Sequence, residues 1–375
     1  MTVLKGIRVV EFTHMVSGPA CGQVLGDLGA EVIKVEPPSG DITRRLGPGD
    51  GAVSALFATT NRNKRSVCLD LRDAGDAATA RALALAADVV VTNVDGAMLE
   101  KAGLSPAALR ESNPALIVAE ISAFGPGGAL GTDGIAQAAM GLMSVTGAPD
   151  GATYRTGASV VDVSTGVWAA LGVLAALERR RQTGRGDHLA ISLADVCLYM
   201  QYSQLGMFGA EPDLVRRNGN HSMVSCTPVF ETADGRMIVT ILHDRHWETL
   251  CALLGRRDVQ ARPELASNEA RCLRQAEIER LLNPDFGRMP RAAWIDILRQ
   301  KRIPCGPERT YAEVVADDDL RRRGMLYDLP GSAGSSLQVR MPVSFLEHQL
   351  PSACPAPALG DADAAALPRR EHDRR

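Results

Sequence analysis

The stretch IRVVEFTHMVSGPACGQVLGDLGAEVIKVEPP, residues 7–38, decides the fold of this 375-residue chain. Its apolar, β-branched runs at 7–12 and 31–36 are typical of buried strands, and residues 20–28 between them predict a helix that stops at Gly29. A strand, a helix and a second strand in this order predict a β-α-β unit with parallel strands. Ligands of such units bind in the crevice beyond the carboxyl ends of the strands.

Two loops follow these strands, at residues 14–17 and 37–45, and we expect the crevice between them. The first loop runs into Ser17-Gly-Pro-Ala-Cys-Gly22, which is not the G-x-G-x-x-G pattern of dinucleotide-binding domains. The P-loop pattern G-x-x-x-x-G-K-[ST] does not occur in the chain either. The usual dinucleotide and nucleoside-triphosphate chemistries are therefore not indicated.

The same pattern is repeated further along the chain. Strands are predicted at residues 88–92, 115–121 and 188–193, with helices between them, and a glycine-rich loop, Ser122–Asp133, follows the second of these strands. Repeated β-α units with their loops on one edge predict the α/β class, with a doubly wound, Rossmann-like large domain.

A basic segment, Asn61-Arg-Asn-Lys-Arg-Ser66, leads into a further short strand. Its three positive charges have two interpretations. They could bind the phosphate groups of a ligand, as point charges or forks. Alternatively, they form a solvated basic turn, which is the commoner role of such a run.

Composition excludes several classes of partner. The net charge of −3, from 41 basic and 44 acidic residues, gives no reason to expect nucleic acid or an anionic membrane. The eight cysteines contain no C-x-x-C pair, and His243-x-x-His246 alone is a weak metal signal, so no metal site is predicted. Lys5 and Arg8 interrupt the N-terminal apolar run, and the run Val167–Leu177 is too short for a membrane span. We expect a cytoplasmic protein with reduced thiols.

The domain organisation follows from changes in pattern along the chain. Residues 1–209 are predicted to form the large domain, with a last helix from Ala194 to about Gly209, and residues 210–222 a polar linker. A smaller α+β domain is predicted at 223–310, with a hairpin that turns at Asp234-Gly235. The remainder, 311–375, reads as a linker and a C-terminal segment that ends in a solvated, frayed tail at 369–375.

One carboxylate occupies a special place in this pattern. An irregular segment delivers Asp162 to the start of a long apolar helix, predicted from Val163 to about Gln182, whose free N–H groups and positive dipole end favour negative charge. We therefore expect Asp162 to be ionised. The simpler alternative is that Asp162 serves only as the N-cap of this helix, a role in which aspartate is common.

Many short motifs follow one another in order along nearly the whole chain. They include Gly18-Pro19, Leu28-Gly-Ala-Glu-Val-Ile-Lys-Val-Glu-Pro37, Gly40-Asp41, Arg44, Asn61-x-Asn-Lys-Arg-Ser66, Asn113-Pro-x-Leu-Ile117, Gln137-Ala138, Asp162-x-x-x-Gly166, Arg180-x-x-Thr-Gly-Arg-Gly186 and Ile303-Pro-Cys-Gly-Pro307. This set resembles the family III coenzyme A transferases, which include the formyl-CoA and carnitine CoA-transferases. The α-methylacyl-CoA racemases are relatives of that family.

The resemblance implies a CoA-transferase in which Asp162 is the nucleophile, through a mixed anhydride and then an aspartyl-CoA thioester. Coenzyme A is the co-substrate, no other cofactor is needed, and the partners are an acyl-CoA and a carboxylic acid. It also implies an interlocked homodimer and a C-terminal segment that returns to the large domain. By the same resemblance, the CoA contacts are Val16, Ser17, Leu69, Asp70, Leu71, Arg72, Asn93, Val94, Asp95 and Lys101, and the substrate contacts are His14, Gly131, Thr132 and Asp133.

The chain departs from the family pattern at three positions. Pro37 stands where the formyl-CoA:oxalate enzymes have an arginine, Leu130 stands where a lysine is found, and Asp95 stands where the family often has a basic residue. These departures bear on formate and oxalate specificity and on the CoA phosphate contacts. The racemases carry a catalytic histidine at the position that Thr132 occupies here. A threonine hydroxyl has no useful pKa for proton transfer, so a racemase is only the second hypothesis, after the transferase. A non-catalytic CoA-ester binding protein is the third. Donors for oxyanions are expected in the Asn93 loop and the backbone of Ser122–Gly131.

Overall fold

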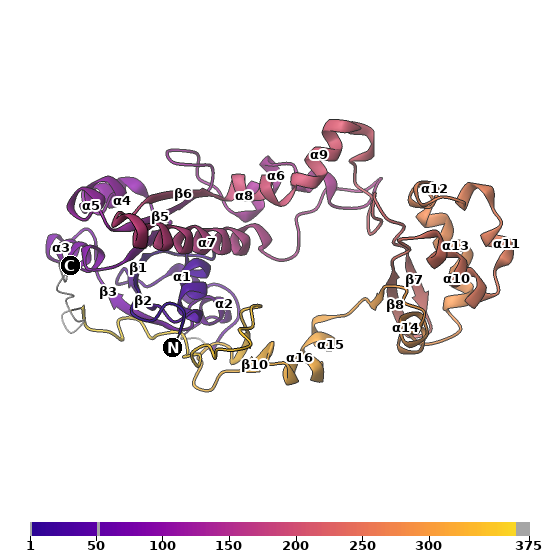
Figure 1. Ribbon diagram of the computed structural model, residues 1–375. Coiled ribbons are helices and arrows are strands. Elements are labelled where there is room, and N and C mark those ends of the chain that lie inside the picture. The colour runs from indigo at the N-terminus through magenta and orange to yellow at the C-terminus, as the bar shows by residue number, and fades with distance from the viewer. Residues whose placement is uncertain (1, 51–52, 365–375) are drawn as a thin grey trace. The chain divides into compact units, whose positions relative to one another are not determined.

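The computed structural model describes residues 2–50 and 53–364, so the predicted frayed tail at 369–375 lies outside the described residues. The chain forms two compact units (Figure 1). The first unit contains the residues up to Met140, Gly157–Met200 and the residues from Asp318 on, and the second contains Gly141–Thr156 and Gln201–Asp317. The N-terminal part of the first unit therefore ends at Met200 and not at the predicted residue 209. Residues 141–156, which were predicted to lie in the large domain, belong to the second unit.

The first unit is built on a six-stranded sheet in the order β3-β2-β1-β4-β5-β6, with every neighbouring pair parallel. The strands are β1 Arg8–Phe12, β2 Glu31–Glu36, β3 Lys64–Cys68, β4 Val89–Thr92, β5 Ile117–Ser122 and β6 His188–Ser192. Val9 lies opposite Val32 of β2 and Val89 of β4, so β1 is central. The order reverses between β1 and β4, which is the topological switch point of a doubly wound fold. The predicted fold class is confirmed.

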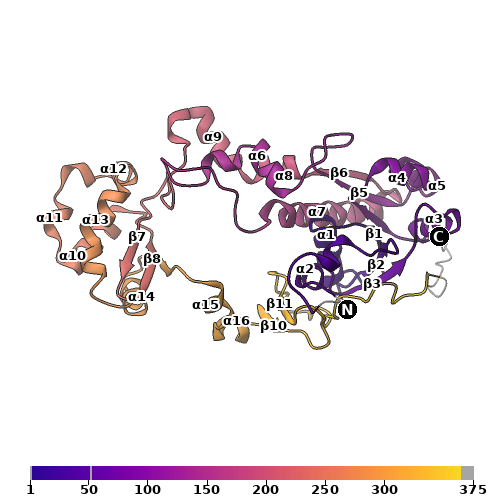
Figure 2. The same cartoon turned by 180° about the vertical axis from the view of Figure 1, so that it is seen from behind.

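Alternation along the strands gives the sheet two different faces. Val10, Ile33 and Val90 belong to one core cluster, into which α3, α4 and α5 send Leu83, Leu99 and Leu109. These three helices lie together at one end of the unit in both views (Figure 2). The opposite face of β1 carries Glu11 and packs against α1.

The helices of the first unit mostly match the predicted segments. They are α1 Ser17–Asp27, η1 Ile42–Arg45, α2 Ala55–Thr60, α3 Ala74–Leu85, α4 Gly96–Lys101, α5 Pro106–Ser112, α6 Asp133–Ala139, α7 Val160–Thr183, α8 Leu193–Met200 and α16 Asp318–Arg322. The single helix predicted from Ala194 to about Gly209 is wrong. The structure has two helices there, because α8 ends at Met200 and the next helix, α9 Tyr202–Ala210, begins after Gln201. This unit also holds the hairpin of β10 Leu326–Asp328 and β11 Leu337–Val339.

Helix α7 packs directly on α1. A Cβ atom on Gly166 would lie 2.6 Å from Cβ of Ala20 and 2.7 Å from the carbonyl oxygen of Ser17, so only glycine permits this approach. With 24 residues, α7 is long and apolar enough to cross a membrane. The sequence prediction considered only the run Val167–Leu177 and therefore underestimated the length of the apolar helix. A single such helix is weak evidence for a span. One side of α7 is buried within the first unit, at Val161, Thr165, Gly166, Ala169, Ala170, Val173, Ala176 and Leu177.

The C-terminal segment returns to the first unit and binds the edge strand β3. Ser66 of β3 donates its N–H to Asp361 at 2.8 Å and accepts the N–H of Ala362 at 2.9 Å. Asn63 and Cys354 exchange two further hydrogen bonds, and the Arg44 guanidinium donates to the carbonyl of Pro357. The segment therefore covers the outer edge of the sheet.

The second unit has a small antiparallel sheet of β7 Val229–Thr232, β8 Gly235–Val239 and β9 Cys305–Pro307. The predicted hairpin is confirmed, since Thr232 pairs with Gly235 around Asp234. The other elements of this unit are η2 Leu142–Val145, α9 Tyr202–Ala210, η3 Pro212–Leu214, α10 Asp244–Leu254, α11 Arg257–Gln260, η4 Pro263–Leu265, α12 Asn268–Cys272, α13 Gln275–Phe286, α14 Arg291–Gln300 and α15 Tyr311–Val315. Its core includes the stacked rings of Phe230 and Phe286, with centroids 4.0 Å apart.

Candidate active site

Asp162 lies in the first turn of α7, as the third residue of the helix. The N-cap position belongs to Ser159, whose side chain makes no capping hydrogen bond. The alternative that Asp162 serves only as the N-cap is therefore wrong. Its half-buried carboxyl group is left for another role.

The carboxylate of Asp133 caps α7 in place of a residue of the helix itself. Its Oδ2 accepts the backbone N–H groups of Val161 at 2.9 Å and of Asp162 at 3.0 Å. Its Oδ1 accepts a hydrogen bond of 2.5 Å from Nε2 of Gln137, one turn further along α6. Asp133 is only 8% exposed, so these three donors hold a buried carboxylate in place. Side-chain oxygens that accept these N–H groups normally come from the N-cap residue.

The surroundings of Asp162 oppose its negative charge. The pKa of Asp162 is raised to about 6, mainly by burial and also by the negative charge of Asp133, while a hydrogen bond with the Ser17 side chain acts in the opposite direction. The positive end of α7 therefore does not dominate, because Asp133 already occupies two of its N–H groups. At pH 7 and above Asp162 is still mostly ionised, as expected, but it is an unusually basic carboxylate.

The loop between β1 and α1 is fixed from several sides. The Asn93 side chain accepts the N–H of His14 and donates to its carbonyl, both at 2.9 Å. Nζ of Lys34 donates to the carbonyl of Thr13 at 2.7 Å. Met15 has a φ of 62°, a backbone conformation that residues other than glycine rarely adopt. The hydrogen bonds on either side of Met15 hold its backbone in this conformation. The Asn93 amide thus positions this loop, whereas the sequence suggested an oxyanion donor in its vicinity.

A cavity of about 470 Å³ lies at the carboxyl ends of β1 and β2, at the predicted edge of the sheet. Six of the predicted contact residues line it, namely His14, Leu69, Asp70, Leu71, Arg72 and Val94. The predicted loop 37–45 contributes Pro37, Ser39, Gly40, Asp41 and Ile42, while Met98 was not predicted from the sequence.

The other predicted contacts lie outside the lining of this cavity. Val16 and Ser17 are buried at the start of α1, and Asp95 caps α4 by accepting the N–H of Ala97 at 3.0 Å. Lys101 is exposed at the end of α4. Asp162 is connected to the cavity through the loop from His14, which lines it, to Ser17, which bonds Asp162.

Charge is unevenly arranged around the cavity. The Arg72 guanidinium, 83% exposed, forms two hydrogen bonds of 2.9 and 2.8 Å to the carboxylate of Asp70, and these lower the pKa of Asp70 to about 2. Burial lowers the pKa of His14, so its imidazole is neutral at pH 7. An anionic ligand would therefore have to share Arg72 with Asp70.

Neither predicted interpretation of the basic segment at residues 61–66 fits the structure, because two of its three cations are buried. Lys64 is fully buried, and its Nζ bonds Glu11 at 2.8 Å and the carbonyl of Pro19 at 2.9 Å. Arg62 is buried and forms a two-point ion pair with Asp27. Only the third cation, Arg65, is exposed. Two of the three charges are thus internal ion pairs, which neither bind phosphate nor face solvent.

The glycine-rich loop ends at α6. A Cβ atom on Gly131 would lie 2.8 Å from the ring of Phe124, so this position requires a glycine-sized residue. Thr132 is the exposed N-cap of α6 and its side chain makes no capping hydrogen bond, whereas Asp133 points inward to α7. Of the three residues predicted to contact substrate here, Asp133 is thus already engaged by the protein.

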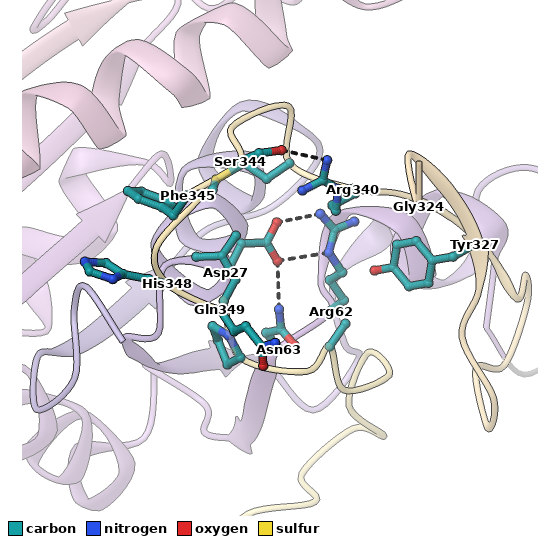
Figure 3. A pocket seen from close by; sticks show the side chains of 14 residues that line it. Asp27, Arg62, Asn63, Gly324, Tyr327, Arg340, Ser344, Phe345, His348 and Gln349 are labelled. Atoms are coloured by element: carbon teal, nitrogen blue, oxygen red, sulfur yellow. Dashed lines mark hydrogen bonds and ion pairs between the residues drawn. The ribbon is translucent and has the colours of Figure 1, made fainter. Parts of the chain in front are cut away.

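A second cavity, of about 500 Å³, lies under the C-terminal segment and contains none of the predicted site residues (Figure 3). Its wall includes the ion pair of Asp27 with Arg62, to which Asn63 adds a hydrogen bond of 2.7 Å. Among residues 2–50 and 53–364, no group of three or more histidine, cysteine, aspartate or glutamate side chains is placed to hold a metal ion.

The sheet order defines a doubly wound α/β protein, which has a crevice at the ends of its strands and a half-buried aspartate one loop away from that crevice. Residues 4–363 match the family model described as CoA-transferase family III. The chain belongs to this family, and it is an enzyme of the CoA-transferase type.

Relatives agree over almost the whole chain. A succinate–glutarate CoA-transferase of Agrobacterium fabrum is 34% identical, covering 98% of this chain and 96% of its own length. An acetyl-CoA:oxalate CoA-transferase of Acetobacter aceti is 32% identical over 96% of this chain and 94% of its own. The crystal structure of a CaiB/BaiF family protein from Brucella suis has a TM-score of 0.86 at 32% identity, covering 96% of this chain and 97% of that one.

Proposed function

We propose that this enzyme transfers coenzyme A from an acyl-CoA to a carboxylic acid through covalent intermediates on Asp162. An oxygen of Asp162 attacks the thioester carbonyl, the C–S bond breaks, and the electron pair leaves with the CoA thiolate, which gives a mixed anhydride. The thiolate then attacks the Asp162 carbonyl, and the donor acid departs as a carboxylate. The acceptor carboxylate attacks the resulting aspartyl-CoA thioester, and the same steps in reverse complete the exchange.

One observation carries the proposal: Asp162 is a half-buried, basic carboxylate, one loop away from the crevice at the strand ends. A carboxylate with a pKa near 6 is a better nucleophile than an ordinary aspartate and is still ionised at neutral pH. Partial burial also protects an anhydride or thioester from hydrolysis by water.

We assign the CoA ester to the crevice. The proposed contacts are Val16, Ser17, Leu69, Asp70, Leu71, Arg72, Asn93, Val94, Asp95 and Lys101, and the proposed acyl and acid contacts are His14, Gly131 and Thr132. Asp133, which the resemblance also implies as a substrate contact, is not assigned that role, because both of its oxygens accept hydrogen bonds from the protein. Of the CoA contacts, Leu69 to Arg72 and Val94 have the strongest support, because they line the cavity. Backbone N–H groups of the glycine-rich loop are the proposed oxyanion donors.

Dicarboxylic acids are the first acceptors to test, because relatives that are 32–34% identical are named for succinate, glutarate, oxalate and mesaconate. The decisive experiment incubates the protein with succinyl-CoA and then with hydroxylamine or borohydride. Mass spectrometry should find the modification on the peptide that contains Asp162. A mass change must be absent in Asp162→Asn, and an unmodified wild-type peptide during active turnover would refute the covalent mechanism.

The racemase hypothesis has less support, because Thr132 has no group able to exchange a proton at neutral pH. A racemase would incorporate solvent deuterium at the α-carbon of an acyl-CoA without exchanging the acid. A non-catalytic CoA-ester binding protein would bind CoA equally well after Asp162→Ala and show no turnover. Both outcomes differ from those of the transferase.

We further propose a homodimer. Val163, Val167 and Leu171 lie at four-residue intervals on α7, and each is about half exposed, at 50%, 49% and 51%. A helix presents residues at this spacing on one face, and an exposed apolar stripe of this kind is typical of an interface. A second copy of the chain is the proposed partner, and a cytoplasmic location stays a prediction from the sequence.

A further inference from the structure

Two carboxylates meet at the start of α7, and only Asp162 has a proposed chemical role. Asp133 is the other. It is 8% exposed, it belongs to α6, and its Oδ2 accepts the peptide N–H of Asp162 itself at 3.0 Å as well as that of Val161. Gln137 fixes its second oxygen. Both oxygens of Asp133 therefore accept hydrogen bonds from the protein, and three of the roughly four acceptor sites of its carboxylate are occupied by protein donors.

Few other charges surround Asp162. Asp133 is the only ionisable residue of α6, and Asp162 is the only one of α7 before Glu178. α1 contributes the Ser17 hydroxyl, which bonds Asp162, and the thiol of Cys21, whose pKa burial raises, while its one carboxylate is at its far end, at Asp27.

Two further groups lie on neighbouring segments. α8, which packs on both α6 and α7, carries Asp195, and this exposed carboxylate accepts a hydrogen bond of 2.6 Å from Ser192. His14, in the loop before α1, is neutral at pH 7. Asp133 is therefore the charge that acts on Asp162.

We propose that Asp133 is a positioning residue that makes Asp162 a stronger nucleophile. Asp133 takes up two peptide N–H groups that would otherwise stabilise a carboxylate at the start of α7, and it places a second negative charge beside Asp162. This inference rests on the proposed function of Asp162.

The arrangement favours acyl transfer for a simple electrostatic reason. In the free enzyme the two carboxylates repel each other. When Asp162 attacks the thioester, its oxygen bonds to the acyl carbon and the negative charge leaves with the thiolate sulfur. The repulsion is therefore relieved as the covalent intermediate forms, which lowers the energy of this step relative to the free enzyme.

The test uses Asp133→Asn, which keeps an oxygen for the N–H groups of Val161 and Asp162 but removes the charge. The titration of Asp162 is followed by carbon NMR of protein labelled at the aspartate carboxyl carbons, with its resonance identified by its loss in Asp162→Asn. We expect a midpoint near pH 6 in the wild type and a lower one in Asp133→Asn. Asp133→Glu, which keeps the charge, should preserve the raised midpoint.

Kinetics give the second readout. The rate of Asp162 modification by succinyl-CoA at pH 7.5 should fall about threefold for each pH unit by which the midpoint moves, if nucleophilicity follows basicity as it does for thiolates. The KM for succinyl-CoA should not change. Asp195→Asn, which removes an exposed carboxylate from the start of α8, is the matched control and should alter neither readout.

The outcomes separate the two proposals. An unchanged Asp162 midpoint in folded Asp133→Asn would overturn the inference, as would a change in KM alone, which would indicate a substrate contact. A thermal melt shows whether each variant is folded, and Asp133→Glu provides a second reading if Asp133→Asn unfolds. Because the NMR midpoint does not depend on turnover, it tests the coupling even if Asp162 proves not to be the nucleophile.

Discussion

The side-chain amide of Asn93 binds the backbone of His14 in both directions, through an accepted N–H and a donated hydrogen bond of 2.9 Å each. This pair joins the end of β4 to the loop after β1, across the switch point of the sheet. A Cβ atom on Gly18 would lie 3.0 Å from Cγ of Asn93, so α1 also begins against this amide. The Asn93 side chain is therefore one of the groups that position the candidate site.

Asn93→Ala should lower the free energy of unfolding by about 1–3 kcal/mol, because two backbone groups of His14 lose their partner. It should also raise the KM for acyl-CoA, since His14 lines the crevice. Asn113→Ala is a matched control, because Asn113 also bonds backbone groups, at Leu85 and Ala115, away from the crevice. The control should lose stability with an unchanged KM. Equal KM values in both variants would contradict the positioning role.

Asp162→Asn should stabilise the protein while it abolishes turnover. The pKa of Asp162 is raised from an ordinary value of 3.8 to about 6, so the folded state binds this proton more tightly than the unfolded state. The stability due to this group is complete below pH 4 and is lost as the pH rises through 6, by at most about 3 kcal/mol. Urea denaturation should therefore show the variant to be more stable at pH 7.5 and equal at pH 4. A less stable variant at pH 7.5 would contradict this.

Lys64→Met should destabilise the fold strongly. Removing this cation leaves the carboxylate of Glu11, which is 0% exposed, with only the longer 3.5 Å contact to Lys34, and breaking a buried pair costs about 3–5 kcal/mol. Arg65→Met is the control in the same strand, because Arg65 is 48% exposed and 3.6 Å from Glu31. The control should cost less than about 1 kcal/mol in urea denaturation. Similar losses in the two variants would mean that the internal network adds little.

Arg72→Ala tests the crevice as the CoA site. The guanidinium is exposed and shared with Asp70, so it can turn to a phosphate group without unfolding anything. We expect the dissociation constant for CoA, measured by calorimetry, to rise about tenfold, and the effect to shrink at high salt. Arg65→Ala should leave CoA binding unchanged. Unaltered binding in Arg72→Ala would move the CoA phosphates elsewhere.

Leu171→Glu tests the homodimer. A charge in the middle of the apolar stripe on α7 should shift the protein to monomers in analytical ultracentrifugation, because a buried unpaired carboxylate opposes association. Leu273→Glu, at an exposed apolar residue of the second unit, is the control and should leave the mass unchanged. A monomeric wild type, or a dimer that tolerates Leu171→Glu, would exclude this stripe as the interface.

Periodicity predicted the sheet and the edge at which the crevice lies, because strand pattern and β-α-β chirality are local rules. Periodicity could not predict that Asp133 caps α7. Asp133 and Asp162, whose N–H it accepts, are 29 positions apart, and a local pattern carries no information on so distant a contact. The basic segment misled for the same reason. The partners of Arg62 and Lys64, Asp27 and Glu11, come from α1 and β1, and burial of a charge becomes visible only when its partner is placed.

The hydrogen bonds between Ser66 and residues 361–362 have a consequence for handling the protein. β3 ends the sheet, and without the C-terminal segment its outward N–H and C=O groups would be open to strands of other molecules. A chain truncated after residue 353 should therefore self-associate into aggregates rather than simply lose a tail. By occupying the edge of β3, the C-terminal segment should prevent β-strand pairing between molecules.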